Sequence, residues 1–305
     1  MKSIFVSILN FNGNNDTLEC LESLKKINHS NFKLTVAIID NGSSENLNLK
    51  SQLFGQMKVE VIKNEKNLGF SGGHNVGINY ALKNKADFVI ILNNDTYVDR
   101  NFVEELLKTA EKDSKIGIVS PKIYFAPGFE YHKDRYSKEE RGRVFWYAGG
   151  EMDWKNVIGH HRGVDRIDKG QFDETVETEL GTGCCMLIRR EVFDEVGTFD
   201  DRYFLYYEDA DLCMRAKKNN FKIMYVPKSV IWHKNAGSAG GSGSKLQDYY
   251  ITRNRLIFGM RYAPVRAKFA LLRESLKLIL GGRYWQKRGV ADFYLGNLGK
   301  GNYKV

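Results

Sequence analysis

Residues 86–99 read ADFVIILNNDTYVD, an apolar run that ends abruptly in two asparagines and an aspartate. The apolar β-formers at 88–92 are typical of a strand that is buried on both faces of a parallel sheet. Asn and Asp favour turns, so the polar residues at 93–95 could simply end the strand. In open α/β sheets, however, ligands bind at the carboxyl ends of the strands. The stretch predicts a parallel sheet and leaves a turn and a ligand site as alternatives for the residues that follow it.

Strand-like and helix-like segments alternate on both sides of this stretch. We expect strands at residues 4–9, 33–39, 59–63 and 88–92, and helices at 17–27 and 76–83. This alternation predicts an α/β fold with a mostly parallel sheet covered by helices. Residues 121–179 have poor periodicity and should form short antiparallel strands. Beyond them we expect strands at 184–188, 222–226 and 230–233, a helix at 208–219, a flexible loop at 237–244 and a helical tail after residue 249.

The composition is that of an ordinary globular protein, with 305 residues, 42% hydrophobic and 27% charged. Its four cysteines form no C-x-x-C pair, which favours a reduced, cytoplasmic protein. The chain opens directly in a strand-like run, so we expect no signal peptide. No apolar stretch approaches the roughly 18 residues of a membrane span.

The net charge of +9 is concentrated in the C-terminal tail. Residues 253–305 hold 12 Lys or Arg against Glu274 and Asp292, a net charge of +10, so residues 1–252 sum to −1. A basic tail on a nearly neutral body indicates a local segment that binds anionic groups. These groups could belong to phospholipid as well as to nucleic acid.

Three polar clusters directly follow predicted strands, at residues 10–12, 40–42 and 93–95. Carboxyl ends of parallel strands meet at one sheet edge, where a nucleotide would bind. The glycine-rich stretch NLGFSGGHNVG, residues 67–77, belongs with them. Its glycines allow close approach to a ligand and its helix start suits phosphate, although each glycine could instead be structural. The absence of G-x-G-x-x-G and of a P-loop motif argues against a dinucleotide oxidoreductase and a P-loop NTPase.

A second candidate site is the stretch FLYYEDADLCMRAKKNNF, residues 204–221. Glu208 and Asp209 lie at a predicted helix start, where carboxylates serve as caps. The aromatic residues before them favour a different role, because a carboxylate beside aromatic rings at a cleft is a typical general base. Asp211 and Arg215 are spaced as a surface ion pair.

A third candidate is His233, which ends the apolar strand of VIWHKNAG. A lone histidine is usually not a metal ligand, and its partner would have to be Asp95 from another strand end. A carboxylate with an imidazole suits Mn²⁺ better than an all-oxygen Mg²⁺ site.

Six ordered motifs resemble those of family 2 glycosyltransferases with the GT-A fold, most closely bacterial rhamnosyltransferases of polysaccharide pathways. They are VSILNFNG, IIDNGSSEN, KNLGFSGGHNVGI, IILNNDT, the stretch from GCCMLIRREVF to AKKNNFKI, and VIWHKNAG. The resemblance covers about residues 3–255. It implies a nucleotide-sugar-binding half at 1–120 and an acceptor-binding, catalytic half of the same domain at 121–255, followed by a basic amphipathic helical tail at 256–305.

The resemblance also implies a role for individual residues. Asn10 and Phe11 would line the base pocket, and Asp40 would accept a hydrogen bond from the pyrimidine N3–H. The further donor-binding residues would be Asn67, Gly69, Gly72, Asn75, Asn93 and Asn94. Asp95 and His233 would bind a divalent cation, Mn²⁺ or Mg²⁺. Asn93 departs from the family's D-x-D motif, and one fewer anionic ligand should weaken the binding of the cation.

Asp209 would be the general base on the acceptor side, where Trp146, Gly150, Thr182 and Glu208 would help to shape the site. The implied enzyme is a metal-dependent, inverting hexosyltransferase that uses a dTDP- or UDP-sugar, with rhamnose favoured. The acceptor would be a glycan or a lipid-pyrophosphate-linked oligosaccharide, and no nucleic acid is involved. A sugar-nucleotidyltransferase and a non-catalytic carbohydrate-binding module are the alternatives. The first would need a G-G-x-G-T-R-like loop near residue 10, where the sequence is LNFNGNN.

The tail contains an amphipathic pattern at residues 265–280. Its apolar residues recur at helical spacing: Val265, Phe269, Leu272, Leu276, Ile279 and Leu280. Arg266, Arg273 and Lys277 follow one edge of this stripe. Two interpretations remain open, a helix packed on the catalytic domain and a helix in the interface of an anionic membrane. The second predicts a cytoplasmic protein that is peripheral on the inner face of the plasma membrane.

Overall fold

The computed structural model describes residues 1–29, 31–49, 52–54, 57–235 and 243–304. The strands are β1 (Lys2–Asn10), β2 (Phe32–Asp40), β3 (Gln52–Phe54), β4 (Met57–Lys63), β5 (Phe88–Asn93), β6 (Thr96–Val98), β7 (Ile116–Phe125), β8 (Phe145–Tyr147), β9 (Gly150–Asp153), β10 (Ile158–His161), β11 (Val176–Glu177), β12 (Cys185–Arg189) and β13 (Lys222–His233). The helices are α1 (Asn14–Leu24), α2 (Gly69–Lys83), α3 (Phe102–Ala110), α4 (Arg190–Val196), α5 (Glu208–Lys218), α6 (Lys245–Tyr262), α7 (Val265–Gly281) and α8 (Tyr284–Leu295), with a 3-10 turn η1 (Lys133–Arg135).

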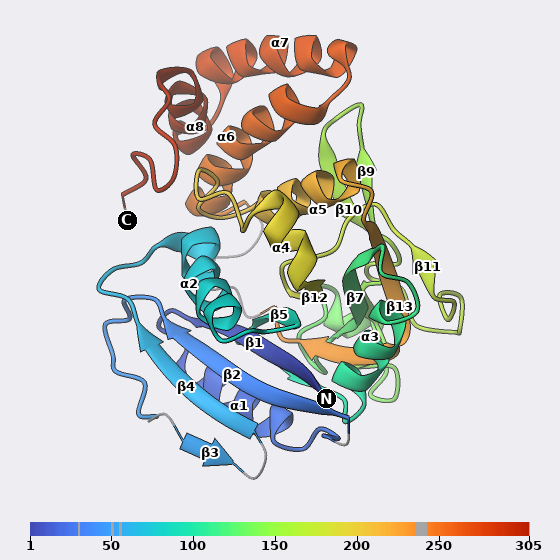
Figure 1. The fold of residues 1–305 in the computed structure, drawn as a ribbon. Coiled ribbons are helices and arrows are strands. Elements are labelled where there is room, and N and C mark those ends of the chain that lie inside the picture. The colour runs from blue at the N-terminus through green and yellow to red at the C-terminus, as the bar shows by residue number, and fades with distance from the viewer. Residues whose placement is uncertain (30, 50–51, 55–56, 236–242, 305) are drawn as a thin grey trace.

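One large mixed sheet organises the described residues (Figure 1). Its order is β11-β13-β7-β12-β5-β1-β2-β4-β3, and β6 and β8 pair with β13 and β7. Strands β5, β1, β2 and β4 run parallel, as the alternating pattern predicts. Strand β12 is antiparallel to both β5 and β7 and joins the two halves of the chain into a continuous sheet.

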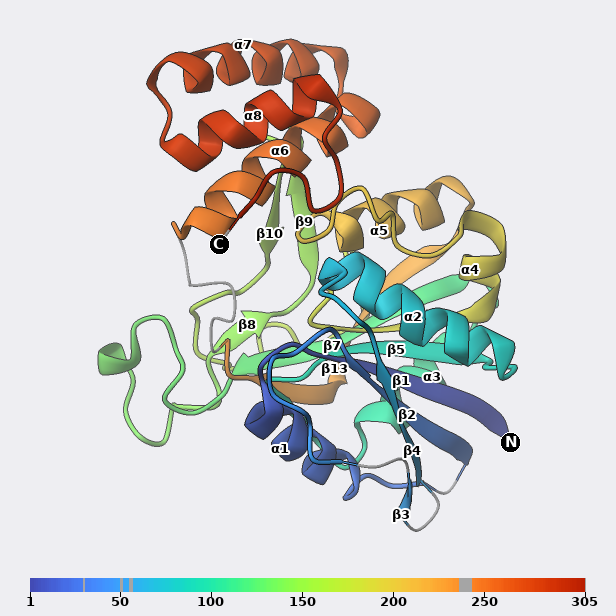
Figure 2. The same ribbon diagram turned by 90° about the vertical axis from the view of Figure 1, so that its left-hand side faces the viewer.

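Both faces of the sheet are covered, which accounts for the uninterrupted apolar run of β5. Phe88, Ile90 and Leu92 pack in one hydrophobic cluster with α1 and α3, whereas Val89 and Ile91 pack in the other with α2, α4 and α5. Figure 2 shows these helices on opposite sides of the sheet. A strand that buries both alternating sets of side chains reads as a continuous apolar segment.

Three sequence-based expectations about elements were wrong in part. Helix α2 begins at Gly69, not at residue 76, so much of the glycine-rich stretch is helical. The segments 222–226 and 230–233 belong to one strand, β13, with an irregularity between Val226 and Val230. Within the segment expected to hold short antiparallel strands, β7 extends to Phe125 and pairs in parallel with β13.

The three C-terminal helices lie together at one end of the molecule, beside α5 and the β9–β10 hairpin (Figures 1 and 2). Helix α6 begins at Lys245, upstream of the expected boundary at residue 256. No helix in the described ranges is both long and apolar enough to cross a bilayer. In the loop expected at 237–244, residues 237–242 lie outside the described part of the chain.

Candidate active site

The turns after β1, β2 and β5 meet at one edge of the sheet, as predicted. Asn10 is in register with Asp40, and Leu9 is in register with Asn93. Parallel strands that end together bring the residues after them into one row. The three polar clusters therefore lie side by side and form one surface.

Asn10 connects these turns to one another. It is fully buried, and its amide nitrogen donates to Asn14 Oδ1 (3.0 Å) and Ser43 Oγ (3.3 Å). Its carbonyl oxygen accepts from Gly13 N–H (3.2 Å) and Thr17 Oγ1 (3.0 Å). Asn10 thus fixes the shape of the turn, whereas the neighbouring Phe11 is 41% exposed and presents a ring to solvent.

Asp40 and Asn41 end β2 in different environments. Asp40 is buried, and its Oδ1 accepts from the N–H of Ser43 (3.3 Å). Asn41 donates to Asn67 Oδ1 (3.1 Å) and to the carbonyl of Gly69 (3.0 Å), and it accepts from Leu68 N–H (3.1 Å). Asn41 is therefore the residue that attaches the start of α2 to the sheet edge, a role that the sequence analysis did not assign.

The start of α2 is already occupied by a backbone carbonyl. Phe70 N–H and Ser71 N–H donate to Phe204 O at 2.6 and 3.3 Å. Gly69 has a positive φ of 76°, and a Cβ there would lie 2.4 Å from the same carbonyl oxygen. The expectation of a phosphate at this helix start is therefore wrong for this conformation, because the loop before α5 takes the N–H groups.

Two further residues of the predicted donor set face protein groups. Asn75 donates to Phe199 O (2.9 Å) and Asp201 Oδ1 (2.7 Å) and accepts from Phe199 N–H (3.0 Å). A Cβ on Gly72 would lie 2.9 Å from Leu68 Cβ. The bonds of Asn75 join α2 to the segment before α5.

Asp95 and His233 come together as predicted, although they are far apart in sequence. Asp95 Oδ1 lies 3.1 Å from His233 Nε2, and Asn93 Nδ2 lies 3.5 Å from the same nitrogen. His233 is 4% exposed, and its Nδ1 has no hydrogen-bond partner among the described residues. Strand β6 places them, because His233 of β13 is in register with Thr96.

These two side chains fit a divalent cation that is shared with another ligand. A carboxylate oxygen and an imidazole nitrogen this close are a plausible donor pair for Mn²⁺ in both chemistry and spacing. In the described ranges, no group of three or more His, Cys, Asp or Glu is arranged to hold a metal. Among the described residues, Asp95 and His233 therefore form part of a coordination sphere. Asn94 does not join them, since it donates to Gly13 O (3.2 Å) and Thr17 Oγ1 (3.0 Å).

Aromatic and imidazole rings line the neighbouring surface. The ring of Trp146 lies edge-on to His233, with centroids 4.6 Å apart. His161 Nδ1 lies 3.1 Å from the carbonyl of Trp146, a position that sequence reasoning missed because nothing local marks this histidine. Burial lowers the pKa of His161 to about 4, so its ring is neutral near pH 7. Trp146 of β8 and His161 of β10 thus place two neutral rings beside His233.

Asp209 is held by the turn that leads into β12. Its Oδ2 accepts from Gly183 N–H at 2.8 Å, and its Oδ1 accepts from Ala210 N–H at 2.7 Å. Burial raises the pKa of this carboxyl above its ordinary value, while the N–H bonds oppose that effect. The residue after Gly183 is Cys184, and its backbone carbonyl accepts a hydrogen bond from Asn93 N–H at 2.9 Å. A short backbone path therefore joins Asp209 to the turn that carries Asp95.

Glu208 lies deeper than Asp209. It is 4% exposed, and its Oε2 has no hydrogen-bond partner among the described residues. Burial raises the pKa of Glu208 well above its ordinary value, and the charge of Asp209 adds to this shift. Neither acid is the N-cap residue of α5, since Tyr207 holds that position without a side-chain capping bond, although Asp209 accepts from the Ala210 N–H in the first turn.

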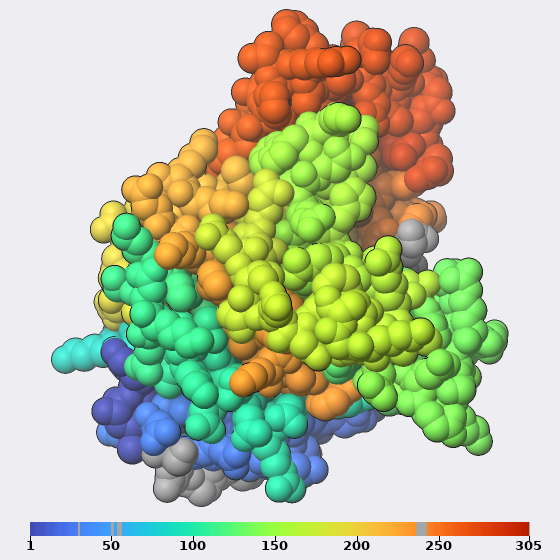
Figure 3. All heavy atoms as spheres, turned by 90° about the vertical axis from the view of Figure 1, so that its right-hand side faces the viewer, coloured from blue at the N-terminus to red at the C-terminus, as the bar shows by residue number. Residues whose placement is uncertain are grey.

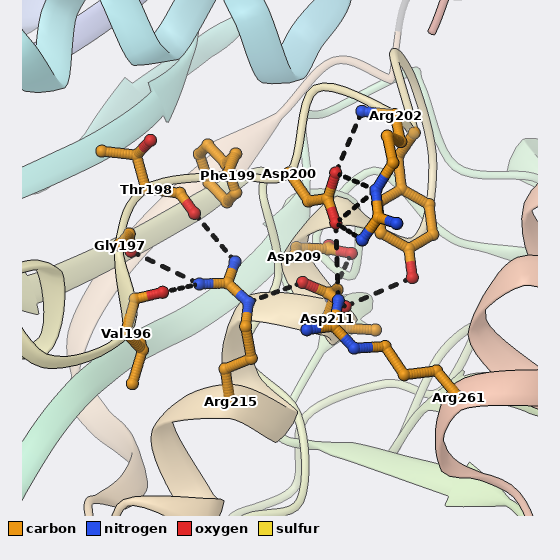
Figure 4. Close-up of polar contacts among 12 residues, drawn as sticks. Val196, Gly197, Thr198, Phe199, Asp200, Arg202, Asp209, Asp211, Arg215 and Arg261 are labelled. Carbon is orange, nitrogen blue, oxygen red and sulfur yellow. Dashed lines mark hydrogen bonds and ion pairs between the residues drawn. The ribbon is translucent and has the colours of Figure 1, made fainter. Parts of the chain in front are cut away.

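The predicted surface ion pair of Asp211 and Arg215 is instead buried, which corrects the sequence-based interpretation (Figure 4). Asp211 is fully buried and accepts from Arg215 Nε (2.7 Å), Arg261 Nη1 (2.9 Å) and Tyr262 Oη (2.7 Å). Arg215 also donates to the carbonyls of Val196, Gly197 and Thr198. This network fixes α5 against the end of α6 and against residues 196–198, which precede Glu208 and Asp209 in the chain.

The loop that leads into Glu208 has an unusual backbone. Phe204, Tyr206 and Tyr207 have positive φ values of 64°, 70° and 74°. The left-handed conformation costs a non-glycine residue about 1–2 kcal/mol. Such strain persists where surrounding contacts determine it, and it clusters at functional sites.

Two fully buried residues of α6 hold this loop. Asn254 Nδ2 lies within hydrogen-bond distance of three carbonyls, those of Tyr203 (2.9 Å), Leu205 (2.7 Å) and Tyr206 (2.9 Å). Arg253 Nη2 donates to the carbonyl of Tyr203 (3.0 Å), and its Nε donates to Asn254 Oδ1 (3.0 Å). We call these two residues the α6 clamp. No local sequence signal predicts that they act on a loop some fifty residues earlier.

The other predicted acceptor-side residues surround the same turn. Thr182 Oγ1 accepts from Cys184 N–H (3.3 Å), and Gly150 pairs with Leu180 as an isolated bridge. Tyr147 Oη donates to the carbonyl of Leu180 at 2.8 Å. Residues 180–184 therefore connect the β8–β9 region, Asp209 and the end of β5.

Residues 2–259 match the family model described as Glycosyltransferase like family 2. The chain belongs to glycosyltransferase family 2. Its identification rests on a match over most of the chain and agrees with the resemblance carried by the six motifs.

Named relatives of this family 2 glycosyltransferase act in glycan synthesis. It is 24% identical over 79% of its length to the dTDP-rhamnosyl transferase RfbF of Shigella flexneri, covering 71% of that protein. It is 26% identical over 72% of its length to the low-salt glycan biosynthesis hexosyltransferase Agl10 of Haloferax volcanii, covering 65% of that protein. It is 31% identical over 50% of its length to the N-acetylglucosaminyl-diphospho-decaprenol L-rhamnosyltransferase of Mycobacterium tuberculosis, covering 49% of that protein.

The family 2 glycosyltransferase also shares its fold with solved GT-A enzymes. One is GalNAc-T7 with UDP, GalNAc and Mn²⁺, at a TM-score of 0.60 and 18% identity, over 97% of this chain and 58% of that one. Another is Staphylococcus aureus TarS 1-349 with UDP-GlcNAc, at a TM-score of 0.58 and 15% identity, over 96% of this chain and 79% of that one. The predicted α/β, GT-A fold is confirmed. The roles of individual site residues stay predictions.

Proposed function

We propose that the protein is an inverting hexosyltransferase that transfers a sugar from a dTDP- or UDP-sugar, with rhamnose favoured. The acceptor is a hydroxyl of a glycan or of a lipid-pyrophosphate-linked oligosaccharide in cell-surface polysaccharide synthesis. Membership of family 2 supports the reaction class, and relatives named as rhamnosyltransferases support the sugar. A lipid-linked acceptor would place the reaction at the inner face of the plasma membrane.

The observation that carries the proposal is the position of Asp209. Gly183 N–H holds its carboxylate, and the adjacent Cys184 carbonyl holds the turn of Asn93 and Asp95. A general base must reach the proton that it removes while the donor is held nearby. The short backbone path between the two turns supports that juxtaposition.

In the proposed reaction, Asp209 removes the proton from the acceptor hydroxyl. The acceptor oxygen forms its bond to the anomeric carbon, and the bond from that carbon to the diphosphate oxygen breaks on the opposite face. One displacement inverts the configuration and requires no nucleophilic side chain. Asp95 and His233 would hold a divalent cation, Mn²⁺ or Mg²⁺, whose charge stabilises the leaving diphosphate.

The residues of the donor surface fall into two groups, those free to contact the nucleotide and those that hold the surface in shape. Phe11 is exposed enough to stack on a base, and Asp40 retains a second carboxylate oxygen that could accept from the pyrimidine N3–H. Asn10, Asn67 and Asn75 are engaged with protein groups. We propose that these three act by fixing the donor surface, and that Phe11 and Asp40 contact the nucleotide.

Products of a donor screen test this function. The protein is incubated with dTDP- and UDP-sugars and a lipid-pyrophosphate-linked acceptor, with Mn²⁺ or Mg²⁺. We expect release of the nucleoside diphosphate, a lengthened acceptor and an inverted anomeric configuration by NMR. Retention of configuration would exclude the proposed displacement.

A second incubation, with a nucleoside triphosphate and a sugar 1-phosphate, separates the alternatives. A sugar-nucleotidyltransferase would release pyrophosphate from this mixture. A non-catalytic module would bind without turnover. Either result would overturn the proposal.

A further inference from the structure

We infer that α7, together with a basic hollow beside it, docks on an anionic phospholipid bilayer. The apolar stripe of α7 does not pack on the catalytic domain. Val265, Phe269, Leu276 and Leu280 are 69%, 70%, 59% and 82% exposed. The helix itself is packed, as one of the two interpretations expected, but through its other side, so the stripe stays exposed.

Helix α7 packs through its opposite side. Its buried residues are Ala267, Leu271 and Ser275. Leu271 approaches Gly259 of α6 so closely that a Cβ on the glycine would lie 2.2 Å from Leu271 Cδ1. Ser275 Oγ bonds Tyr294 Oη of α8 at 2.7 Å. Because α6 and α8 hold the inner face, the apolar stripe faces outward. Helix α7 lies at one end of the molecule (Figure 1).

Basic side chains flank this stripe. At about 100° per residue, Arg266, Arg273 and Lys277 fall along one edge of the stripe, and Lys268 falls along the other. None of these four side chains pairs with an acid among the described residues. An apolar face with basic edges is typical of helices that lie in a membrane interface.

A hollow of about 250 Å³ adjoins the basic edge. It lies where α6 and α7 meet the turn of the β9–β10 hairpin, and Figure 3 shows the hairpin region rising alongside the C-terminal helices. Lys155, Arg255, Arg273 and Lys277 line it with one acid, Glu274. Arg255 neutralises that acid through two bonds of 2.8 and 3.0 Å. The hollow is therefore positively charged.

The positive charge of α7 and the hollow indicates which kind of partner binds there. The hollow and the tail are both basic, with a net charge of +10 over residues 253–305. A second copy of the chain would bring like charges together, which is destabilising. An anionic phospholipid satisfies both features, since its headgroup matches the cations and its acyl region receives the apolar stripe.

Vesicle sedimentation of the full chain tests the inference without any sugar donor, so its result is independent of the proposed chemistry. Vesicles contain phosphatidylglycerol and phosphatidylcholine, or phosphatidylcholine alone. We expect binding to the anionic vesicles that weakens with salt. The double variant Phe269→Gln/Leu276→Gln should bind at least about tenfold more weakly. Its matched control is Phe129→Gln/Leu53→Gln, which changes two exposed apolar residues elsewhere.

The charged edge is tested in the same way. The variant Arg273→Gln/Lys277→Gln should lose about 20-fold in binding, since each basic residue near an anionic surface contributes about fivefold. Its control is Arg166→Gln/Lys112→Gln, at exposed positions away from the tail. All four changed sites are exposed, and circular dichroism melting verifies folding.

Three results would overturn the inference. They are negligible binding at low salt, equal binding by each variant and its control, and equal binding to neutral vesicles. A dimer in solution that Phe269→Gln/Leu276→Gln dissociates would assign the face to a second copy instead. Free inorganic phosphate that abolishes vesicle binding of the wild type at unchanged ionic strength would assign the hollow to a soluble anion.

Discussion

Glu208 combines burial, a neighbouring carboxylate and an oxygen without a described partner. Its pKa is raised in the folded state, so folding favours its protonated form. Stability should therefore fall as the pH rises from the unfolded value, about 4.3, toward the folded value. Glu208→Gln removes this dependence and should raise the free energy of unfolding at pH 8 by about 1 kcal/mol or more, with little change at pH 4.

Urea unfolding at several pH values measures this difference. Glu195→Gln, at an exposed position, is the control and should show none of it. A gap between wild type and Glu208→Gln that does not depend on pH would contradict a strained carboxylate at residue 208.

Asp95 and His233 make a separate prediction about the donor. Asp95→Ala and His233→Ala should each weaken Mn²⁺-stimulated binding of the nucleoside diphosphate by at least about tenfold, as removal of metal-site partners commonly does. EDTA should lower wild-type binding to the level of the variants. Calorimetry measures this, with the exposed His160→Ala as control. If the wild type binds the nucleoside diphosphate equally well in Mn²⁺ and in EDTA, the proposal that a cation takes part in donor binding is wrong.

Single residues were predictable where a strand end marks them. Asp95 follows an apolar strand and His233 ends one, and the structure places the two side chains 3.1 Å apart, while their role as metal ligands stays a prediction. Gly183 was not predictable as the partner of Asp209, because that hydrogen bond depends on the place of β12 between β5 and β7. The buried network of Asp211 was likewise missed, since Arg261 and Tyr262 reach it from another helix.

At the scale of the element, the α6 clamp predicts that a helix other than the one that carries Asp209 controls turnover. Asn254→Leu would leave the carbonyls of Tyr203, Leu205 and Tyr206 without this donor, and it would release a loop whose three left-handed residues cost about 3–6 kcal/mol. We expect unfolding free energy to fall by about 2–4 kcal/mol. We also expect kcat to fall by about tenfold or more, with donor affinity unchanged.

Leu256→Ala on the same helix is the matched control. Leu256 is buried, and its truncation should cost about 2–5 kcal/mol without touching the loop. If it lowers kcat as much as Asn254→Leu at a temperature where both variants are folded, the clamp contributes stability only.

Helix α2 shows where element prediction failed. Glycine disfavours helices, so the glycine-rich stretch predicts a loop. The structure shows tertiary packing instead, because a Cβ on Gly73 would lie 2.3 Å from Leu9 and one on Gly77 would lie 2.2 Å from Ser7. The helix must approach β1 closely, and that requirement outweighs helix propensity.

At the scale of the whole molecule, the alternating apolar segments predicted the parallel half of the sheet. They did not predict the mixed half, because antiparallel β12 and the parallel pair β7–β13 depend on crossovers that leave no local pattern. The packing of the tail could also be determined only from the structure. Periodicity located its apolar stripe, whereas only packing shows which side of α7 faces its neighbours.

The central claim is that Asp209 is the general base of an inverting transfer, and the kcat of Asp209→Asn tests it most directly. Asparagine keeps the shape of the side chain but cannot accept the proton. We expect kcat to fall by about 10²–10⁴-fold, while donor affinity stays within about twofold of wild type. Wild-type kcat should also fall as the pH drops through the raised pKa of Asp209, because only the carboxylate can act as the base. Retention of more than about a third of the wild-type kcat by Asp209→Asn would contradict the assignment.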